Sequence, residues 1–230
     1  MKAVLLDIEG TTTPIDFVHK VLFPFSAEKM PEFVKANFDE IQKEIAQLEG
    51  EYKQDFVSGK YRKQFEKQSP TSVSDYLLFL ISQDRKSTPL KSLQGKIWQI
   101  GYESGNLKSV VFDDVPPAFG RWKSEGKEIA IFSSGSILAQ KLLFKYTNHG
   151  DLTPFISTYF DTTTGNKKDP RSYLLIASQL KLNGSEILFV SDVIEELDAA
   201  KEAGFQTALS VRNNQKINSS HRIVKTFEEI

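Results

Sequence analysis

The sequence lacks cysteine, a large net charge and any long hydrophobic run. None of its 230 residues is cysteine, which excludes disulfide bonds, thiolate metal sites and a thiol nucleophile. Its formal net charge of −1 argues against a general nucleic-acid binder, because such proteins are normally basic. No apolar run approaches the roughly 20 residues that a membrane-spanning helix needs. We therefore expect no nucleic-acid partner and no membrane partner.

No charged-then-apolar leader precedes the first apolar run, which begins at Ala3. Without such a leader we expect a cytoplasmic protein, with the nucleus as a second compartment if the source is a eukaryote. At 230 residues the chain is long for one simple domain and short for two full ones. A core domain with an insertion fits this length.

The most informative segment lies at the start of the chain. Residues 4–6 are apolar without alternation, which is typical of a strand buried on both faces. Asp7 and Glu9 follow this strand, and Gly10 lets the chain leave the sheet sharply. Open α/β sheets bind their ligands at this end of a central strand, and two carboxylates there suit Mg²⁺ and phosphate. The alternative is an ordinary strand-to-turn exit in which Asp7 caps the turn.

Hydrophobic periodicity divides the chain into two kinds of structure. Residues 17–105 carry apolar side chains at three- and four-residue spacing, which predicts helices. One such stripe runs over 30–48, and the charged segment 49–69 is interpreted as a solvated helix or loop. The prolines expected near helix starts are Pro24, Pro31, Pro70 and Pro89.

From about residue 106 onward, predicted strands alternate with predicted helices, which implies a parallel sheet with right-handed crossovers. The predicted strands are 128–132, 158–160, 187–190 and 206–211. The helices between them include 137–146, 170–180 and 195–203. The resulting α/β organisation has a core formed by residues 1–16 and 106–230 and a helical insertion at 17–105.

Polar residues follow the predicted strands at one edge of the sheet. Ser133 and Ser134 end one strand and open a helix, where a hydroxyl, free amides and the helix N-terminus can hold phosphate. Asp192 ends another strand and can complete an oxygen-ligand Mg²⁺ site with Asp7. Each residue alone also has an ordinary explanation as a helix N-cap or a turn. Their occurrence together at corresponding strand ends favours a site.

A cation is still needed, because carboxylates and phosphate repel one another. Lys167 and Lys168 lie in a loop before a predicted helix, and spacing alone does not choose between them. The three histidines, His19, His149 and His221, show no metal-ligand spacing, so we interpret them as surface or packing residues.

Four motifs in this order resemble the haloacid dehalogenase superfamily of phosphohydrolases. They are Asp7-Ile8-Glu9-Gly10-Thr11-Thr12, Ser133-Ser134-Gly135, Lys167 and Ser191-Asp192. Most phosphatases of that superfamily carry Asp two residues after the nucleophile, whereas this chain has Glu9. That departure is similar to the enolase-phosphatase (acireductone synthase) family of methionine salvage. Further matches to that family are Thr11–Ile15, Leu22–Pro24, Asp84–Lys86, Leu93–Gly95 with Trp98, Ala139–Phe144 and Tyr159–Thr162.

The resemblance implies an α/β fold, with a Rossmann-like parallel sheet core of the haloacid dehalogenase type and an inserted helical cap. It implies a monomer that uses one Mg²⁺ per chain. It also implies one substrate, 2,3-diketo-5-methylthiopentyl 1-phosphate, which is enolised and then dephosphorylated to 1,2-dihydroxy-3-keto-5-methylthiopentene.

The same resemblance implies roles for individual residues. Asp7 would be the nucleophile that carries an aspartyl phosphate, and Glu9 would transfer protons. Matching Gly165 and Ser172-Tyr173 to the family pattern selects Lys167 over Lys168. The implied phosphate-binding residues are Ser133, Ser134 and Lys167, and the implied metal ligands are Asp7, Glu9 and Asp192. Glu9 would bind through its main-chain carbonyl or its side chain. Glu196 would support this set, or else be a solvated acid in a helix's first turn.

Three other functions are open to a chain with these motifs. A generic sugar phosphatase of the same superfamily would accept many small phosphate esters. A dehalogenase would need neither Mg²⁺ nor Glu9. A binding module with an inactive site is disfavoured, because all the motif residues are intact.

Overall fold

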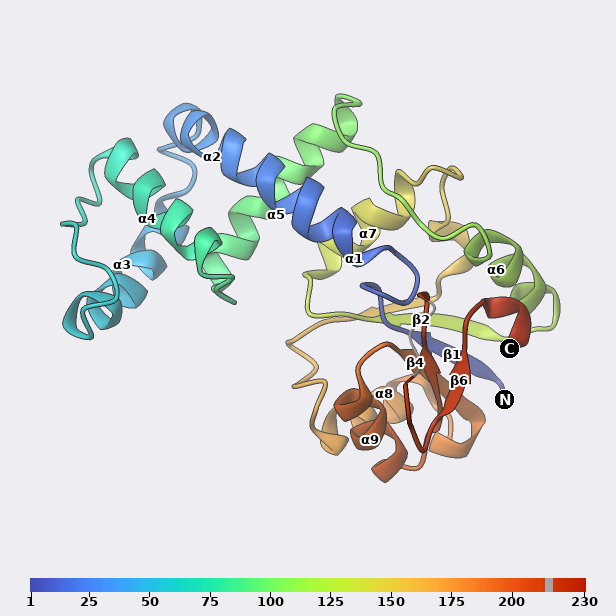
Figure 1. The fold of residues 1–230 in the computed structure, drawn as a ribbon. Helices are drawn as coiled ribbons and strands as arrows, with labels where there is room; N and C mark the ends of the chain where they lie inside the picture. The colour runs from blue at the N-terminus through green and yellow to red at the C-terminus, as the bar shows by residue number, and fades with distance from the viewer. Residues whose placement is uncertain (214–216) are drawn as a thin grey trace. The chain divides into compact units, whose positions relative to one another are not determined.

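The computed structural model describes residues 1–213 and 217–230, and it divides into two compact units (Figure 1). One unit combines Met1–Val18 with Lys108–Ile230, and the other is His19–Leu107. The sequence-based boundaries lie at 16/17 and 105/106, two residues before each of these junctions. Across the described residues, no helix is both long and apolar enough to cross a membrane.

The first unit is built on a six-stranded sheet in the order β3-β2-β1-β4-β5-β6. All neighbouring strands pair in parallel. The strands are β1 (Ala3–Leu6), β2 (Glu128–Phe132), β3 (Thr158–Phe160), β4 (Ile187–Ser191), β5 (Gln206–Ser210) and β6 (Arg222–Val224). β1 and β4 are buried along their whole length, which explains why their apolar residues do not alternate. The α/β class and the parallel sheet are confirmed.

The register of the sheet decides which side chains meet at its edge. Leu6, the last residue of β1, pairs with Ile131 of β2 and Val190 of β4. The chain runs from β1 to β2 and β3 on one side and to β4, β5 and β6 on the other. The edge beyond β1 is therefore the switch point where such sheets bind ligands.

Helices cover both faces of this sheet. They are α1 (Ile15–Phe17), α6 (Val115–Ser124), α7 (Ile137–Lys145), α8 (Pro170–Leu180) and α9 (Ile194–Glu202). In Figure 1, α8 and α9 lie on one face of the sheet, and α6 and α7 lie on the other. The predicted helices at 137–146, 170–180 and 195–203 agree with α7, α8 and α9 to within one residue. Helix α6 and the three-residue strand β6 were not predicted, although α6 buries Val115, Ala118, Phe119 and Trp122 at helical spacing.

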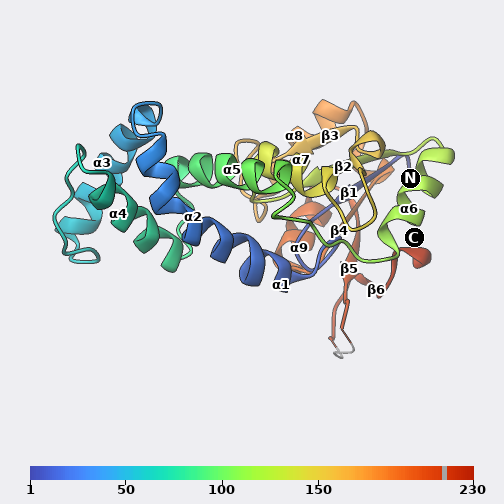
Figure 2. The same cartoon turned by 90° about the horizontal axis from the view of Figure 1, so that it is seen from above.

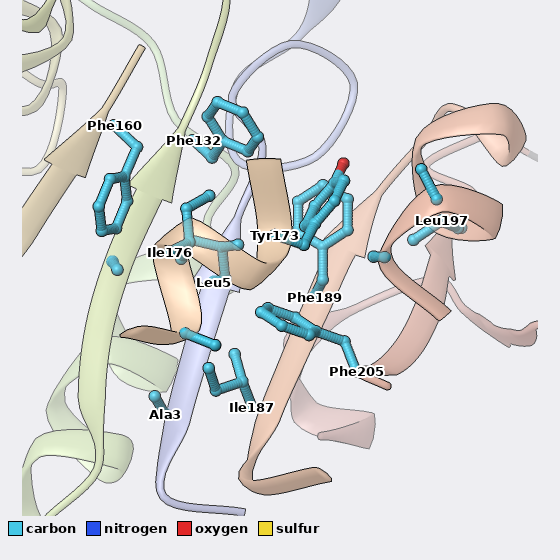
Figure 3. Packing of buried hydrophobic residues seen from close by; sticks show 14 of the residues in the cluster. Ala3, Leu5, Phe132, Phe160, Tyr173, Ile176, Ile187, Phe189, Leu197 and Phe205 are labelled. Atoms are coloured by element: carbon cyan, nitrogen blue, oxygen red, sulfur yellow. The ribbon is translucent and has the colours of Figure 1, made fainter. Parts of the chain in front are cut away.

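A cluster of aromatic residues fills the space between the sheet and α8 (Figure 3). The Tyr173 ring of α8 lies near Phe132, Phe189 and Phe205, at centroid distances of 5.7, 5.2 and 5.6 Å. All four rings are almost fully buried. This packing holds the start of α8, and the loop before it, against the carboxyl ends of β2 and β4.

The second unit is helical. Its helices are α2 (Phe23–Ala36), α3 (Gln42–Val57), α4 (Pro70–Ser82) and α5 (Thr88–Glu103), and a π-helical turn, Val18–Leu22, leads into α2. Helix α2 packs against α4 and α5 (Figure 2). The predicted stripe over 30–48 spans two helices, and the charged segment 49–69 is helical only as far as Val57.

One proline was placed wrongly from sequence. Pro24, Pro70 and Pro89 lie in the first turns of their helices, as predicted. Pro31 lies inside α2, which begins at Phe23 directly after the π-helical turn Val18–Leu22.

Replacing Phe189 should destabilise the first unit strongly. Phe189→Ala removes a fully buried ring from β4, and we expect the free energy of unfolding to fall by about 3–5 kcal/mol, because lost contacts and a residual cavity add. Leu174→Ala on α8 is the matched control, since Leu174 is 55% exposed, and should change it by less than about 0.5 kcal/mol. Urea unfolding followed by circular dichroism measures both. Equal losses would contradict this account of the core.

Candidate active site at the carboxyl ends of the strands

The structure brings the predicted acidic residues and one lysine together at the switch point. Asp7 follows β1, Asp192 follows β4, and Lys167 comes from the loop before α8. Glu196 joins them from the first turn of α9. Asp7, Lys167 and the pair Asp192 and Glu196 come from three separate parts of the sequence and meet because the parallel strands end at the same edge.

Three hydrogen-bond donors fix the Asp7 carboxylate. Its Oδ1 accepts from the Ile8 amide at 2.8 Å and from Lys167 Nζ at 2.6 Å. Its Oδ2 accepts from the Ser191 hydroxyl at 3.1 Å. The side chain is nearly buried, so these donors replace the water that a carboxylate otherwise needs. Asp7 is therefore held in one orientation beside a cation.

Lys167 links two carboxylates. Its Nζ lies 2.6 Å from Asp7 Oδ1 and 2.7 Å from Glu196 Oε2, and its side chain is 6% exposed. Burial by itself lowers the pKa of Lys167, but the charges of Asp7 and Glu196 raise it above its ordinary value. The ammonium group therefore keeps its proton, and it neutralises two acids that would otherwise repel each other.

The choice between the two lysines follows from their surroundings. The Lys168 side chain is 56% exposed, and its ion pair with Glu195 is 3.8 Å long. The Tyr173 hydroxyl, by contrast, donates to the Lys167 carbonyl at 2.6 Å. The buried aromatic cluster therefore holds the backbone at Lys167, which points one lysine inward and leaves its neighbour in solvent.

The same loop makes a close approach at Gly165. A Cβ placed there would lie 2.2 Å from Ser172 Oγ, and the residue has a φ of +143°. Ser172 in turn donates to the Asn166 carbonyl at 2.7 Å. Glycine at 165 thus allows the loop to pack tightly against the start of α8.

Glu196 is a member of the cluster rather than a solvated acid. It is buried, and its Oε2 lies 3.1 Å from Ser191 Oγ as well as 2.7 Å from Lys167. Burial and the charge of Asp7 raise the pKa of its carboxyl. Ser191 is the residue that sequence reasoning missed, since it was noted only as the neighbour of Asp192. Its position as the last residue of a buried strand was the available signal.

Asp192 and Gly10 lie in very close contact. Gly10 has a φ of +68°, and a Cβ placed on it would lie 2.1 Å from Asp192 Oδ2. Only glycine fits, both for its backbone conformation and for the space available. Burial and the charge of Asp7 raise the pKa of Asp192 to about 7. Asp192 is half-buried, and a bound cation would relieve the repulsion between its carboxyl and the neighbouring Asp7 carboxylate.

The donor set suits a hard divalent cation, because Asp7 and Asp192 offer only oxygen ligands. Within residues 1–213 and 217–230, no three His, Cys, Asp or Glu side chains gather as a metal-binding group. A cation here would therefore need main-chain, water or substrate oxygens in addition to these carboxylates. Glu9 is half-buried, and its backbone forms an isolated bridge with Thr13.

Ser133 is not the N-cap of α7, which was the alternative interpretation of this residue from the sequence. The N-cap of α7 is Ser136, whose hydroxyl accepts from the Ala139 amide at 3.3 Å. Ser133 is buried after β2, and its hydroxyl accepts from the Gly135 amide at 3.2 Å. Ser134 lies next to it, half-buried. The turn after β2 thus presents hydroxyls and amides at the same edge as Asp7.

Comparison with known proteins identifies the family. The haloacid dehalogenase-like hydrolase family matches residues 1–204. The chain is 49% identical over 226 residues to a Leptospira borgpetersenii protein named Enolase-phosphatase E1, which covers 97% of this chain and 96% of that protein. It is 50% identical over 211 residues to the protein of the same name from Synechococcus elongatus, covering 91% of this chain and 88% of that one. The chain belongs to the enolase-phosphatase family of haloacid dehalogenase-like hydrolases.

A solved structure extends this likeness to the whole fold. The UTR4 protein of Saccharomyces cerevisiae matches with a TM-score of 0.81 and 32% identity, covering 100% of this chain and 99% of that one. Haloacid dehalogenase-like phosphatases generally use Mg²⁺, in keeping with the oxygen-only donors of Asp7 and Asp192 in this enolase-phosphatase family member.

The two lysines should differ sharply in importance. Lys167→Ala leaves Asp7 and Glu196 without their shared cation, so we expect phosphate release from a small ester to fall by about 10²–10³-fold. Lys168→Ala, the adjacent control, should change the rate by less than about twofold, since an exposed ion pair contributes little. Steady-state assays measure both rates, and circular dichroism checks that each variant is folded. A larger loss in the Lys168 variant would overturn the assignment.

Proposed function

We propose that this chain is a Mg²⁺-dependent enolase-phosphatase of methionine salvage. It would convert 2,3-diketo-5-methylthiopentyl 1-phosphate to 1,2-dihydroxy-3-keto-5-methylthiopentene and phosphate, acting as a cytoplasmic monomer. The observation that carries the proposal is the buried Asp7–Lys167–Glu196 cluster, with Glu9 two residues beyond Asp7. We assign the helical unit His19–Leu107 the role of the cap.

In the phosphatase step, Asp7 acts as the nucleophile. One of its carboxylate oxygens attacks phosphorus, the bond from phosphorus to the substrate oxygen breaks, and an aspartyl phosphate forms. Lys167 and the Ser133 turn stabilise the charge on the phosphoryl oxygens. Water then hydrolyses the acyl phosphate, which releases phosphate and restores Asp7. The hydrogen bonds from Ile8, Ser191 and Lys167 hold the Asp7 carboxylate in one orientation for this attack.

In the enolase step, a proton leaves the carbon that bears the phosphate and a proton is added to the neighbouring carbonyl oxygen. Glu9 can carry protons at the substrate carbon or at the leaving oxygen. Its side chain is one methylene longer than that of Asp, so its carboxylate can reach further from the backbone. The enolised leaving oxygen is less basic than a simple alkoxide, so its departure needs less help from an acid.

Asp7 and Asp192 would hold the Mg²⁺, with Glu9 contributing its main-chain carbonyl or its side chain. When bound, the ion supplies positive charge that stabilises the phosphoryl oxygens and the two carboxylates. Lys167 and Glu196 also contribute to the net charge of the site, because Lys167 forms ion pairs with both Asp7 and Glu196.

Removing the nucleophile should abolish turnover. Asp7→Asn keeps the size of the side chain, but an amide does not attack phosphorus. We expect a loss on the order of 10⁴-fold in kcat, as for other lost nucleophiles. Mass spectrometry of acid-quenched enzyme should find a phosphorylated Asp7 in the parent protein and none in the variant. Near-normal turnover by a folded Asn variant would rule out this role.

Metal removal tests the second part of the proposal. Exhaustive chelation should stop phosphate release, and added Mg²⁺ should restore it. Ca²⁺ should restore it poorly, because the larger ion accepts looser geometry. Asp192→Asn should weaken Mg²⁺ binding, so that a higher Mg²⁺ concentration is needed for half-maximal rate. Full activity after chelation would exclude a metal role.

The deciding experiment compares substrates. Burying a three-carbon-sized methylthio tail gains about 2 kcal/mol, or roughly 30-fold in the specificity constant. The diketo phosphate should therefore exceed simple sugar phosphates by at least this factor, followed by phosphate release and by the ultraviolet absorbance of the enol. Glu9→Gln should reduce its turnover by about 10²-fold or more while phosphate binding persists. Equal turnover of sugar phosphates would favour the generic phosphatase instead.

A further inference from the structure

The turn that follows Glu9 is held largely through its backbone, and the Thr12 hydroxyl also donates to the Ile8 and Asp7 carbonyls at 3.2 and 3.3 Å. Thr11 and Thr13 are fully buried, yet their hydroxyls have no hydrogen-bond partner among the residues that the structure describes. The amides of Thr11, Thr12 and Thr13 all donate to the Ile8 carbonyl, at 3.2, 2.9 and 2.9 Å. The position of this turn, defined here as residues 10–13, therefore depends on what its carbonyl groups meet.

Those carbonyl groups are anchored from distant parts of the same unit. Ser210 Oγ donates to the Gly10 carbonyl at 3.1 Å, and the Phe112 amide donates to the Thr12 carbonyl at 3.0 Å. Between them, Arg212 donates twice to the Thr11 carbonyl, from Nε at 2.9 Å and from Nη2 at 2.6 Å. Arg212 is the charged donor of these three, and charge-assisted hydrogen bonds are the stronger kind.

Arg212 is itself tightly constrained. Its guanidinium carbon lies 4.5 Å from the Phe112 ring centroid and 4.4 Å from that of Phe227. Its Nη1 lies 2.7 Å from Asp114 Oδ2, and both of these side chains are about nine-tenths buried. Its Nη1 also donates to the Lys225 carbonyl at 3.1 Å. Two rings, a carboxylate and two carbonyls together determine the plane of the guanidinium. A guanidinium held in this way also restricts the motion of the Thr11 carbonyl to which it donates.

We propose that Arg212 is a positioning residue: its guanidinium fixes the turn 10–13 and thereby the Glu9 carboxylate. The proposal rests on the proposed function, in which Glu9 transfers a proton. Glu9 is joined to the turn by the next peptide bond and by the bridge between Glu9 and Thr13. The Asp7 carboxylate has its own donors, Ile8, Ser191 and Lys167, and the turn reaches Asp7 only at its main chain, where the Thr12 hydroxyl lies 3.3 Å from the Asp7 carbonyl. Loosening the turn should therefore harm enolisation more than phosphoryl transfer.

A purely structural role offers the competing explanation, in which Arg212 only anchors the C-terminal segment. Arg121 provides the comparison, because it binds that same segment. Its Nη2 donates to the carbonyl oxygens of Phe227 and Ile230, at 2.6 and 2.9 Å, and its guanidinium lies over the Trp122 ring. Arg121→Ala thus removes a C-terminal anchor and leaves the donors to Thr11 in place.

The test uses Arg212→Ala, Arg212→Lys and Arg121→Ala in the full chain. Amide hydrogen exchange at residues 11–13, read by nuclear magnetic resonance, should speed up by about tenfold or more in both Arg212 variants and by less than about twofold in Arg121→Ala. Lysine keeps the charge but cannot supply the same fork of donors, so it should not restore protection. If Arg212→Ala does not fold, Arg212→Lys carries the same comparison.

The second measurement separates the two chemical steps. Enolisation is followed as deuterium incorporation from solvent into the diketo phosphate, and phosphoryl transfer as phosphate release from a simple ester. In the Arg212 variants, kcat for enolisation should fall by about tenfold or more, with KM and ester hydrolysis changed by less than about threefold. Arg121→Ala should leave both steps near the parent values.

The outcomes distinguish this proposal from the proposed function. Unchanged exchange in the Arg212 variants, faster exchange without a selective loss of enolisation, or equal effects in Arg121→Ala would overturn the positioning role. If the parent protein does not enolise the diketo phosphate, the proposed function fails. Exchange at the turn then decides by itself whether Arg212 holds it.

Discussion

The site depends on one buried cation that is shared by two carboxylates. Asp7 and Glu196 are both buried, and two such charges in a poorly solvated space are strongly unfavourable without a counter-charge. Lys167 lies within hydrogen-bond distance of both. Its ammonium group remains charged because the two acids outweigh the cost of its own burial. Removing it would leave Asp7 with a negative neighbour and no cation, whereas the proposed attack on an anionic phosphate needs a positive charge beside Asp7.

Much of the surrounding structure serves to place that lysine. The rings packed around Tyr173 hold α8 against the sheet, and the Tyr173 hydroxyl binds the Lys167 carbonyl. The hydrophobic core and the charged site are therefore coupled through a single side chain. A change in the core near Tyr173 would move the backbone at Lys167 and so disturb the charged cluster around Asp7.

The segment that follows Asp7 shows a second constraint, which is lack of space. Gly10 touches Asp192 so closely that no side chain fits, and the turn beyond it is fixed through backbone carbonyls. Asp7 and Glu9 are two residues apart, yet different parts of the structure hold them. Asp7 is fixed by the neighbouring strand and Lys167, whereas the turn after Glu9 is fixed by residues at the end of β5 and before α6. In the proposed function, this separation would allow one short motif to serve two chemical steps.

The sequence by itself determined the strands around the site, the parallel order of the core and the family motif that contains Asp7 and Glu9. Those features are local, because they depend on apolar runs, turn residues and short motifs. Only the tertiary structure decided three features. They are the burial of Lys167 rather than Lys168, the burial of Glu196, and the presence of Ser191 and Arg212 near the site. Lys167 and Lys168 are chemically identical and adjacent, so spacing alone does not separate them, and only the family resemblance favoured Lys167. Their difference arises from packing around Tyr173, which joins residues distant in the sequence, and Arg212 reaches Thr11 across almost the whole length of the chain.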